Sequence, residues 1–381
     1  MNAQRPVSLS LYDLLARRWP RPAPVVSLAF NSDDSVAAFF GSDGAIAMAV
    51  APDPEPPETR IHIAGDDARK TIRAREKNVP PLLATVAPGA RPIALARNGQ
   101  KGFFVGDEDG AVHRLNANGE WIRSPQKLGA ATRAIDFAPG PGLLAFSDGE
   151  AIALSRGAAG VERVAVEGGE IAALSFSHGG ERLAAAHGRR LSIFDVASRA
   201  RASEIELAGE ACAIVWDKND RWLACPFRGD GLGLVDSVEG RVAALRNFPT
   251  PVRSAGWSAP ANALVASGGF RIATWSMAAP PVGDDASGAL ATGRAGLVVV
   301  ECVAPHPTRD LVAAGYANGQ IVVAAIGGRD EMLLRHSGGA VRALAWSANG
   351  KELAVGAEDE AAIVSFPSIL FKQAVNPRST P

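Results

Sequence analysis

Cysteine is scarce in this chain of 381 residues, which has only Cys212, Cys225 and Cys302. They are far apart and odd in number, so they cannot form a complete disulfide framework, and we expect a reducing compartment. Long apolar runs are missing too: no stretch reaches the roughly 18 residues of a membrane span. The N-terminus lacks the apolar core of a secretory signal. We therefore expect a cytoplasmic protein with no membrane contact.

An excess of charge of one sign is also missing. The 39 Lys and Arg residues balance 40 Asp and Glu residues, for a formal net charge of −1. Dedicated nucleic-acid binders usually carry a net basic surface, so that class is disfavoured. Only seven of the basic residues are lysine, and this preference for arginine suggests a GC-rich bacterial genome. Hydrophobic residues make up 47% of the chain, which is ample for a core without a disulfide or metal.

Motifs of known catalytic chemistry are absent from the sequence. The six histidines show neither HExxH nor paired ligand spacing, which leaves a zinc site unsupported. There is no GxSxG nucleophile elbow and no P-loop phosphate cradle. Acidic residues fall mainly in turns, where Asp is expected for turn geometry. We therefore expect no enzyme activity, no cofactor and no metal, and we interpret His306 as a support for a turn.

A repeated pattern runs along the whole chain. An apolar alternating segment, a polar turn, a second apolar segment, a turn with Gly or Asp and a third apolar segment recur with a period near 40 residues. Two-residue alternation of Ala, Val, Leu and Ile predicts strands, and the polar spacers predict tight turns. The first segments end at Phe30, Leu95, Phe137, Phe176, Trp216, Trp257, Pro305 and Trp346. The chain is therefore predicted to be all-β, with eight repeat units.

Strand triplets of this period cannot bury both faces alone, so neighbouring units must pack on each other. Four-stranded antiparallel blades arranged around an axis meet this need and leave only short edges. We predict a β-propeller with eight blades, and seven blades is the alternative. Trp216, Trp257 and Trp346 end equivalent strands and are predicted to lie in the core.

The repeats resemble those of the WD40-repeat propeller family over nearly the whole chain. APHP at 304–307 followed by TRDLVAAG is similar to the family's first two strands. Phe194-Asp195 and Val235-Asp236 stand where the family's Trp-Asp pair usually ends the third strand, and Trp275 stands there without the Asp. RHSGG at 335–339 resembles the His-containing loop before the first strand. The resemblance implies a rigid propeller that binds other proteins.

Three regions follow from the repeat boundaries: an N-terminal segment at 1–24, the propeller at 25–371 and a C-terminal tail at 372–381. Two long spacings mark insertions near 52–90 and 280–296. Either insertion could be a docking arm or a solvated loop.

Closure of the ring needs a strand from one terminus to complete the blade formed by the other. Val7, Leu9 and Leu11 alternate with serines, which predicts a half-buried strand near 6–15. We expect this strand to join the blade that contains AAIVSF. The alternative is a short helix through Leu11, Leu14 and Leu15.

The turns between the second and third strands cluster on one face of a propeller. In ring order they are acidic in units 8, 1, 2 and 3 and basic in units 4 to 6, which predicts a polarised face that orients a protein partner. The alternative is that charged turn tips are merely solvated. Arg, Tyr and Phe are enriched at binding hot spots. The candidate partner-binding residues are Arg189, Arg190, Arg228, Phe270, Arg271 and Tyr316, with Asp107, Glu108, Asp109, Glu358, Asp359 and Glu360 on the acidic side.

The sequence therefore predicts a non-catalytic protein–protein interaction scaffold, a subunit or assembly platform of a larger bacterial complex. Two other functions stay open. A propeller enzyme or small-molecule binder would have its site at the axial opening, and an RNA-binding protein would use the arginine sector.

Overall fold

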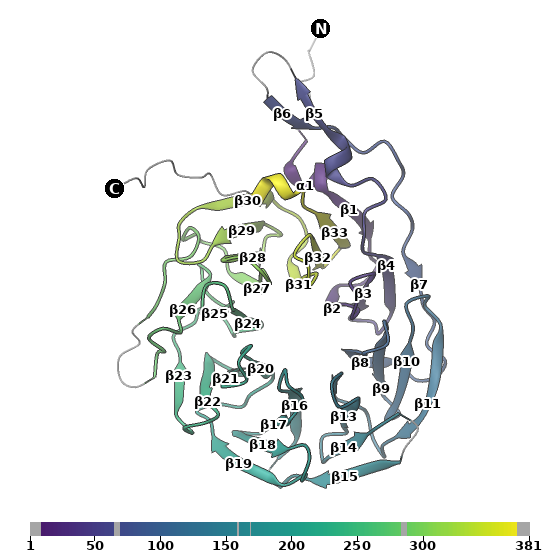
Figure 1. The fold of residues 1–381 in the computed structure, drawn as a ribbon, viewed down its shortest axis with the longest axis vertical. Helices are drawn as coiled ribbons and strands as arrows, with labels where there is room; N and C mark the ends of the chain where they lie inside the picture. The colour runs from purple at the N-terminus through teal and green to yellow at the C-terminus, as the bar shows by residue number, and fades with distance from the viewer. Residues whose placement is uncertain (1–8, 65–68, 158–159, 168, 283–287, 372–381) are drawn as a thin grey trace.

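Eight antiparallel sheets are arranged radially around a central opening (Figure 1). The computed structural model describes residues 9–64, 69–157, 160–167, 169–282 and 288–371. We number the blades 1 to 8 from β2 onwards and name the strands of each blade a to d from the axis outwards. The predicted eight-bladed, all-β propeller is confirmed.

The first four blades each have four strands. Blade 1 consists of β2 (Val25–Phe30), β3 (Val36–Gly41), β4 (Ile46–Val50) and β7 (Leu83–Ala84). Blade 2 consists of β8 (Pro92–Arg97), β9 (Phe103–Asp107), β10 (Ala111–Leu115) and β11 (Trp121–Lys127). Blade 3 consists of β12 (Ala134–Ala138), β13 (Leu143–Ser147), β14 (Ala151–Ser155) and β15 (Val161–Ala165). Blade 4 consists of β16 (Ile171–Phe176), β17 (Arg182–His187), β18 (Arg190–Asp195) and β19 (Arg201–Glu206).

The remaining blades follow the same order. Blade 5 consists of β20 (Val215–Trp216), β21 (Trp222–Pro226), β22 (Leu232–Asp236) and β23 (Val242–Leu245). Blade 6 has β24 (Ala255–Ser258), β25 (Ala263–Ala266) and β26 (Ala273–Ser276), and isolated bridges to Ala289 and Thr292 line its outer edge. Blade 7 consists of β27 (Val300–Pro305), β28 (Leu311–Tyr316), β29 (Ile321–Ala325) and β30 (Glu331–Arg335). Blade 8 consists of β31 (Val341–Trp346), β32 (Glu352–Ala357), β33 (Glu360–Ser365) and β1 (Ala16–Pro20).

Hydrophobic side chains pack between neighbouring blades, so the core is divided among the blade junctions. Leu191 and Ile193 of blade 4, for example, share one buried cluster with Leu223 and Val235 of blade 5. Burial of apolar area is the main stabilising contribution at each junction, and it depends on the next blade being present. The b and c strands are buried along almost their whole length.

The N-terminal segment closes the ring. β1 pairs antiparallel with β33, from Ala16 opposite Val364 to Pro20 opposite Glu360. The segment therefore joins the blade containing AAIVSF, but through residues 16–20 and not through the predicted range 6–15. Residues 6–8 of that range lie outside the described residues.

The short helix α1 (Leu11–Leu15) occupies the end of the predicted strand. The Ser10 side chain accepts a hydrogen bond from the Asp13 backbone N–H, and the Asp13 carboxylate accepts one from the Ser10 backbone N–H. This capping box satisfies backbone donors that would otherwise be unpaired at the helix start, and it outweighs the weak alternation that favoured a strand. None of the helices in the described part of the chain is long and apolar enough to cross a membrane.

The first insertion forms a hairpin that projects from the ring near β1 (Figure 1). Its strands are β5 (Ile61–Ala64) and β6 (Arg69–Ile72), preceded by the 3-10 helix η1 (Pro57–Arg60). The base of the hairpin is held by a buried ion pair between Arg75 and Asp53, 2.6 Å apart. A second 3-10 helix, η2 (Ser368–Phe371), follows blade 8.

Candidate functional site

The turns between strands b and c define one face of the ring, which we call the b–c face. Nine of the predicted partner-binding residues are wholly or partly accessible there. Arg271 is partly exposed. The other eight are exposed: Arg189, Arg190, Arg228, Phe270, Glu108, Asp109, Glu358 and Asp359.

Three predicted residues are buried, which is a correction to the sequence-based site. Asp107, Tyr316 and Glu360 are only 2%, 5% and 6% exposed. The Asp107 carboxylate accepts hydrogen bonds from the backbone N–H groups of Asp109 and Ala111 and lies 2.9 Å from Nε2 of His113. It therefore shapes its own turn instead of facing a partner, as Asp commonly does in tight turns.

Tyr316 and Glu360 are held inside the protein by their neighbours. Tyr316 packs in the hydrophobic cluster of blades 6 and 7, and this burial raises its pKa to about 12. Glu360 accepts a hydrogen bond from the Tyr12 hydroxyl at 2.8 Å and from Nε of Arg18 at 2.9 Å, and it also pairs with the buried Arg335. Neither residue offers its side chain to a partner.

The predicted acidic sector contains arginines as well. Arg91 pairs with Glu108 at 2.9 Å, and Arg342 pairs with Glu358. Arg91 directly precedes strand a of blade 2, and Arg342 is the second residue of strand a of blade 8. The start of each strand a lies on the same face as the b–c turns. The prediction used only the b–c turns, so it gave the acidic sector a more uniform negative charge than this part of the face has.

The basic sector of blades 4 to 6 keeps accessible arginines. The side chain of Arg228 is 60% exposed, and the nearest carboxylate oxygen, on Glu210, is 3.9 Å away. Arg190 pairs with Glu204 at 3.3 Å while its side chain is half exposed. A hollow of about 300 Å³ opens beside Arg228 between blades 4 and 5. Exposed ion pairs of this kind are weak, so these guanidinium groups can exchange partners at low cost.

An apolar pair adjoins this sector. Phe270 is 44% exposed and Leu297 is 95% exposed. The Gly296 backbone N–H donates to the Phe270 carbonyl at 3.0 Å, which holds the two segments together. Leu297 was not predicted, because only the b–c turns were considered and Leu297 lies in the segment before β27. Its place after the second insertion was the available signal.

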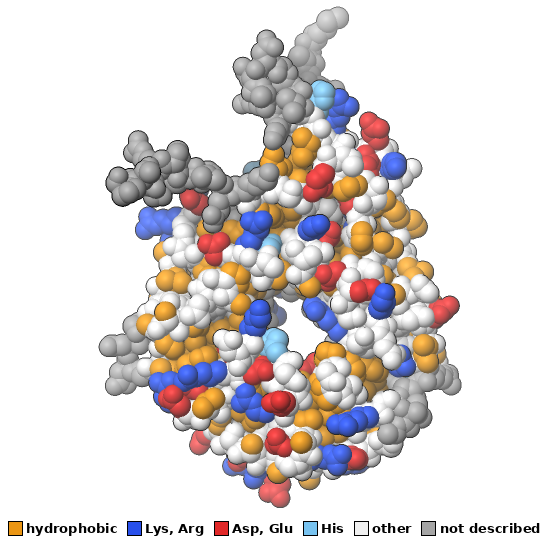
Figure 2. Space-filling view, in the orientation of Figure 1, with side chains coloured by type: hydrophobic (Ala, Val, Ile, Leu, Met, Phe, Trp, Pro, Cys, Tyr) orange, Lys and Arg blue, Asp and Glu red, His pale blue; other side chains and the backbone are white. Residues whose placement is uncertain are grey.

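The inner strands of the blades border the central opening (Figure 1), which remains open in a space-filling view (Figure 2). A cavity of about 440 Å³ lies along the inner strands of blades 1 to 5. Ala94, Ile135 and Ala173 line it together with Cys212. Burial raises the pKa of the Cys212 thiol, so this thiol is less prone to act as a nucleophile.

The opposite face, which we call the a–b face, is formed by the turns between strands a and b. At several junctions these turns are bonded to each other. Lys101 of blade 2 pairs with Asp33 of blade 1 at 2.9 Å, and the His178 backbone N–H of blade 4 donates to Asp220 of blade 5 at 2.6 Å. His306 of blade 7 meets the Gly350 carbonyl of blade 8 at 3.1 Å. Its other ring nitrogen accepts from the Thr308 backbone N–H, so His306 supports the turn as predicted.

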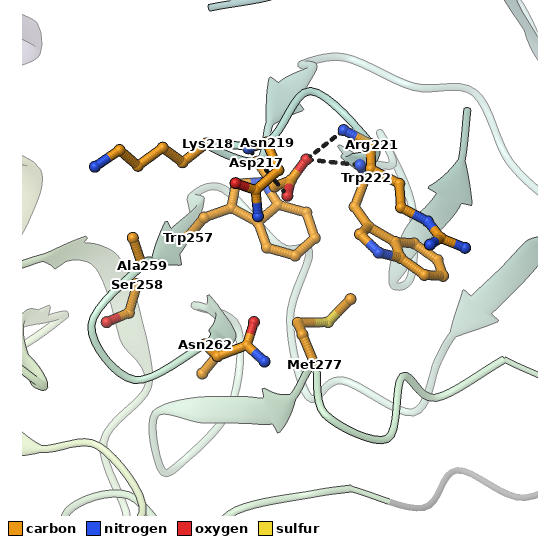
Figure 3. A pocket seen from close by; sticks show the side chains of 11 residues that line it. Asp217, Lys218, Asn219, Arg221, Trp222, Trp257, Ser258, Ala259, Asn262 and Met277 are labelled. Atoms are coloured by element: carbon orange, nitrogen blue, oxygen red, sulfur yellow. Dashed lines mark hydrogen bonds between the residues drawn. The ribbon is translucent and has the colours of Figure 1, made fainter. Parts of the chain in front are cut away.

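A crevice of about 350 Å³ lies on the a–b face between blades 5 and 6 (Figure 3). Its sides are the turn at 217–222 of blade 5 and the turn at 258–263 of blade 6. Trp222 and Trp257 line it from the two blades, and Met277 lies beyond them. Trp257 was predicted to be core, but it is only partly buried because one side of its ring borders this crevice, whereas Trp216 and Trp346 are 3% and 6% exposed.

The acidic groups around the crevice are already engaged. The Asp217 carboxylate accepts from the backbone N–H groups of Arg221 and Trp222, both at 2.7 Å. Arg221 is neutralised by Asp236 at 2.8 Å and Glu239 at 2.7 Å. Burial opposes ionisation of Asp236, but hydrogen bonds from Arg221 and Arg241 lower its pKa well below the usual range. These contacts fix the walls of the crevice.

Comparisons with known proteins agree with this architecture. Residues 304–368 match the family model described as the anaphase-promoting complex subunit 4 WD40 domain. The C-terminal WD40 domain of Sif2 is similar in structure with a TM-score of 0.65 and 13% identity, over 93% of this chain and 99% of that one. U3-55K is similar with a TM-score of 0.56 and 15% identity, over 92% of this chain and 98% of that one. A search of curated protein sequences gave no significant match.

The matched segment covers parts of blades 7 and 8 and includes the APHP phrase that the sequence pointed to. Both structural relatives are matched along nearly their whole length. Three features support the same architecture: the eight radial blades, the N-terminal strand that closes the ring and the matched segment at 304–368. The chain is a β-propeller with eight blades, its fold is similar to that of WD40 domains, and residues 304–368 match a WD40 family model.

Proposed function

We propose that this chain is a non-catalytic platform that binds a partner protein on its b–c face, as part of a larger assembly in the cytoplasm. The contact would centre on blades 4 to 6. The observation that carries the proposal is the exposed pair Phe270 and Leu297, which lies in the same sector as the accessible guanidinium groups of Arg189 and Arg228. An apolar centre with arginines nearby is the composition of binding hot spots.

Other features support this function. A propeller is rigid and presents many loops on one surface, which suits assembly of a complex. The matched family model is named for a subunit of a multiprotein complex. All three cysteines are free, as expected for a reducing compartment.

The proposal is tested by purifying the tagged full chain from its own cells at low salt and identifying stoichiometric partners by mass spectrometry. We expect a protein partner that is lost with the triple variant Arg189→Glu, Arg190→Glu, Arg228→Glu. The double variant Phe270→Ala, Leu297→Ala should lower the affinity for the same partner about 10- to 100-fold, because hot-spot truncation typically costs about 1–3 kcal/mol of binding free energy.

The matched control reverses three exposed arginines away from the b–c face, Arg156, Arg163 and Arg329. These changes alter net charge equally and should leave the partner bound. A partner retained by the first triple variant and by Phe270→Ala, Leu297→Ala would contradict the proposed face. A chain that purifies alone would contradict the platform itself.

A further inference from the structure

A second binding site lies on the other face of the ring, in the crevice between blades 5 and 6. We propose that this crevice binds an extended peptide of a partner protein, with a large apolar side chain between Trp222 and Trp257 and a neighbouring carboxylate on Lys218. The inference rests on the proposed function only in that the ligand is a protein segment. It concerns different residues on the opposite face.

The size and lining of the crevice fit a side chain. Its volume of about 350 Å³ is at the small end of the range for ligand pockets. The partly buried Trp257 ring and the Met277 thioether offer apolar and polarisable contact surface, and the edge of Trp222, which is 7% exposed, completes the wall. Rigid rings bind apolar groups with little loss of conformational entropy. The rigid turn around Asp217 keeps this surface in place before a ligand arrives.

The rim of the crevice offers groups that recognise a peptide backbone. Asn219 comes from the blade 5 turn, and Asn262 comes from the blade 6 turn on the opposite side (Figure 3). Both residues are exposed. A carboxamide donates and accepts at once, so it can pair with both the N–H and the C=O of an extended chain.

Charge selects an acidic ligand. Lys218 is exposed, and no described carboxylate lies within 4.0 Å of its ammonium group. The other cation, Arg221, is already paired with Asp236 and Glu239. Lys218 is therefore the cation at the rim that remains available for a carboxylate from outside.

The same geometry disfavours cationic and nucleic-acid ligands. The Trp222 ring already has Arg221 and Arg241 at 5.6 and 5.7 Å from its centroid, so a further cation would be repelled. A phosphodiester chain needs several free cations along its path. Here Arg221 is already paired with the exposed carboxylate of Glu239, so Lys218 is the one rim cation that the described residues leave for such a chain.

The experiment is a selection from a random heptapeptide library displayed on phage, with the immobilised full chain as the target. We expect enriched sequences to combine Leu, Met, Phe or Trp with an Asp or Glu within three positions. Synthetic peptides from this selection are then titrated by fluorescence polarisation. Lys218→Glu should weaken binding about tenfold or more, since it removes an attraction and adds a repulsion. Ala259→Trp, a change at an exposed position in the lining, should block the apolar subsite.

Matched controls use Lys351, an exposed lysine in the equivalent turn of blade 8. Lys351→Glu and Lys351→Trp should change binding less than twofold, and all variants should keep the unfolding temperature of the parent. The triple arginine variant of the b–c face should also bind the peptides normally. This control separates the proposed function from the peptide site. If the chain binds the selected peptides but captures no cellular partner, only the proposed function is contradicted.

Three results would overturn the inference. The selection could give no enriched family, or the enriched peptides could bind Lys218→Glu and Ala259→Trp as well as the parent. The third is tighter binding of a labelled ten-nucleotide oligouridine than of any selected peptide, which would point to single-stranded RNA instead.

Discussion

The hydroxyl of Tyr12 donates a hydrogen bond to Glu360 at 2.8 Å, which joins two residues 348 positions apart in the chain. Glu360 begins β33, the strand with which β1 pairs. Burial and the nearby Glu360 carboxylate raise the pKa of Tyr12, so it remains a donor at all ordinary pH values. Arg335 holds the same carboxylate from blade 7. This polar cluster therefore ties α1, blade 7 and blade 8 together where the ring closes.

We expect Glu360→Ala to destabilise the protein more than Tyr12→Phe. Loss of the carboxylate leaves Arg335, which is 5% exposed, as an unpaired buried charge, at a cost of about 3–5 kcal/mol. Tyr12→Phe removes one hydrogen bond and costs about 1 kcal/mol. Equilibrium unfolding in urea measures both. Equal losses for the two variants would show that Arg335 finds another partner.

Blade junctions should be sensitive to the indole N–H groups that cross them. The indoles of Trp216, Trp257 and Trp346 donate to strand a of the preceding blade, at Ser175, Val215 and Ala304, with distances of 2.9 to 3.0 Å. Trp346→Phe keeps most of the ring but leaves the Ala304 carbonyl without this donor. We expect a loss of about 1 kcal/mol in unfolding free energy. Trp346→Ala should cost about 3–5 kcal/mol, because it also leaves a cavity.

Asp236 should make the protein sensitive to acid. Its folded pKa lies well below that of an exposed Asp. The stabilisation from its pairs with Arg221 and Arg241 is therefore complete above the unfolded pKa, near 4, and is lost as the pH falls further. We expect Asp236→Asn to cost about 1–3 kcal/mol at pH 7, since it removes the charge of a buried carboxylate whose two arginine partners are about half exposed. Glu239→Gln is the matched control, because it touches the same arginines from an exposed position. The control should change stability by less than about 0.5 kcal/mol. A similar loss for the two variants would refute the importance of burial.

Asp136 should have the opposite effect on pH dependence. Burial raises its pKa to about 6, although its carboxylate accepts a hydrogen bond from the Phe176 backbone N–H at 2.7 Å. The folded state then binds this proton more tightly than the unfolded state, so this group adds stability as the pH falls from about 6 towards 4. Asp136→Asn keeps an acceptor without the charge.

We expect Asp136→Asn to be more stable than the parent at pH 7, by about 1–2 kcal/mol. The difference should shrink below pH 6, because the parent becomes protonated there. Thermal unfolding of both proteins between pH 4 and pH 8 measures this. A constant difference across that range would mean that Asp136 does not titrate in it.

Lowering the pH should also loosen the contact of His306 with blade 8. Burial lowers the pKa of His306, and the neutral ring contacts the Gly350 carbonyl while accepting from the Thr308 backbone N–H. A second proton would convert that acceptor nitrogen into a donor facing an N–H group. Because the unfolded state takes up this proton first, stability should fall as the pH drops below about 6.5. His306→Gln should flatten this part of the profile in pH-dependent urea unfolding, whereas His178→Gln on the exposed turn of blade 4 is the control.

Much of the fold could be predicted because its determinants are local. Two-residue alternation and polar turns located the first three strands of each unit, and the period near 40 residues implied packing between units. The start of the closing strand was misplaced because a five-residue alternation is weak evidence. The Ser10–Asp13 capping box favoured a helix there instead.

The candidate site was less predictable because burial depends on residues far away in sequence. Asp107 and Glu360 are directly adjacent in sequence to the exposed residues Glu108 and Asp359. The carboxylate of Asp107 nevertheless contacts His113 and that of Glu360 contacts Arg335, and both carboxylates are buried. No local pattern distinguishes them. The crevice beside Trp257 was missed for a similar reason, since its walls come from two different repeats.

The amino-acid sequence alone determined that the chain would form strands, turns and a ring of repeated units, because alternation and turn propensity act between neighbouring residues. Only the tertiary structure decided which charged turn residues are enclosed, which arginines remain accessible and where two blades leave a crevice. Those outcomes depend on distances between blades, and on partners such as Tyr12 and Glu360 that meet only when the ring closes.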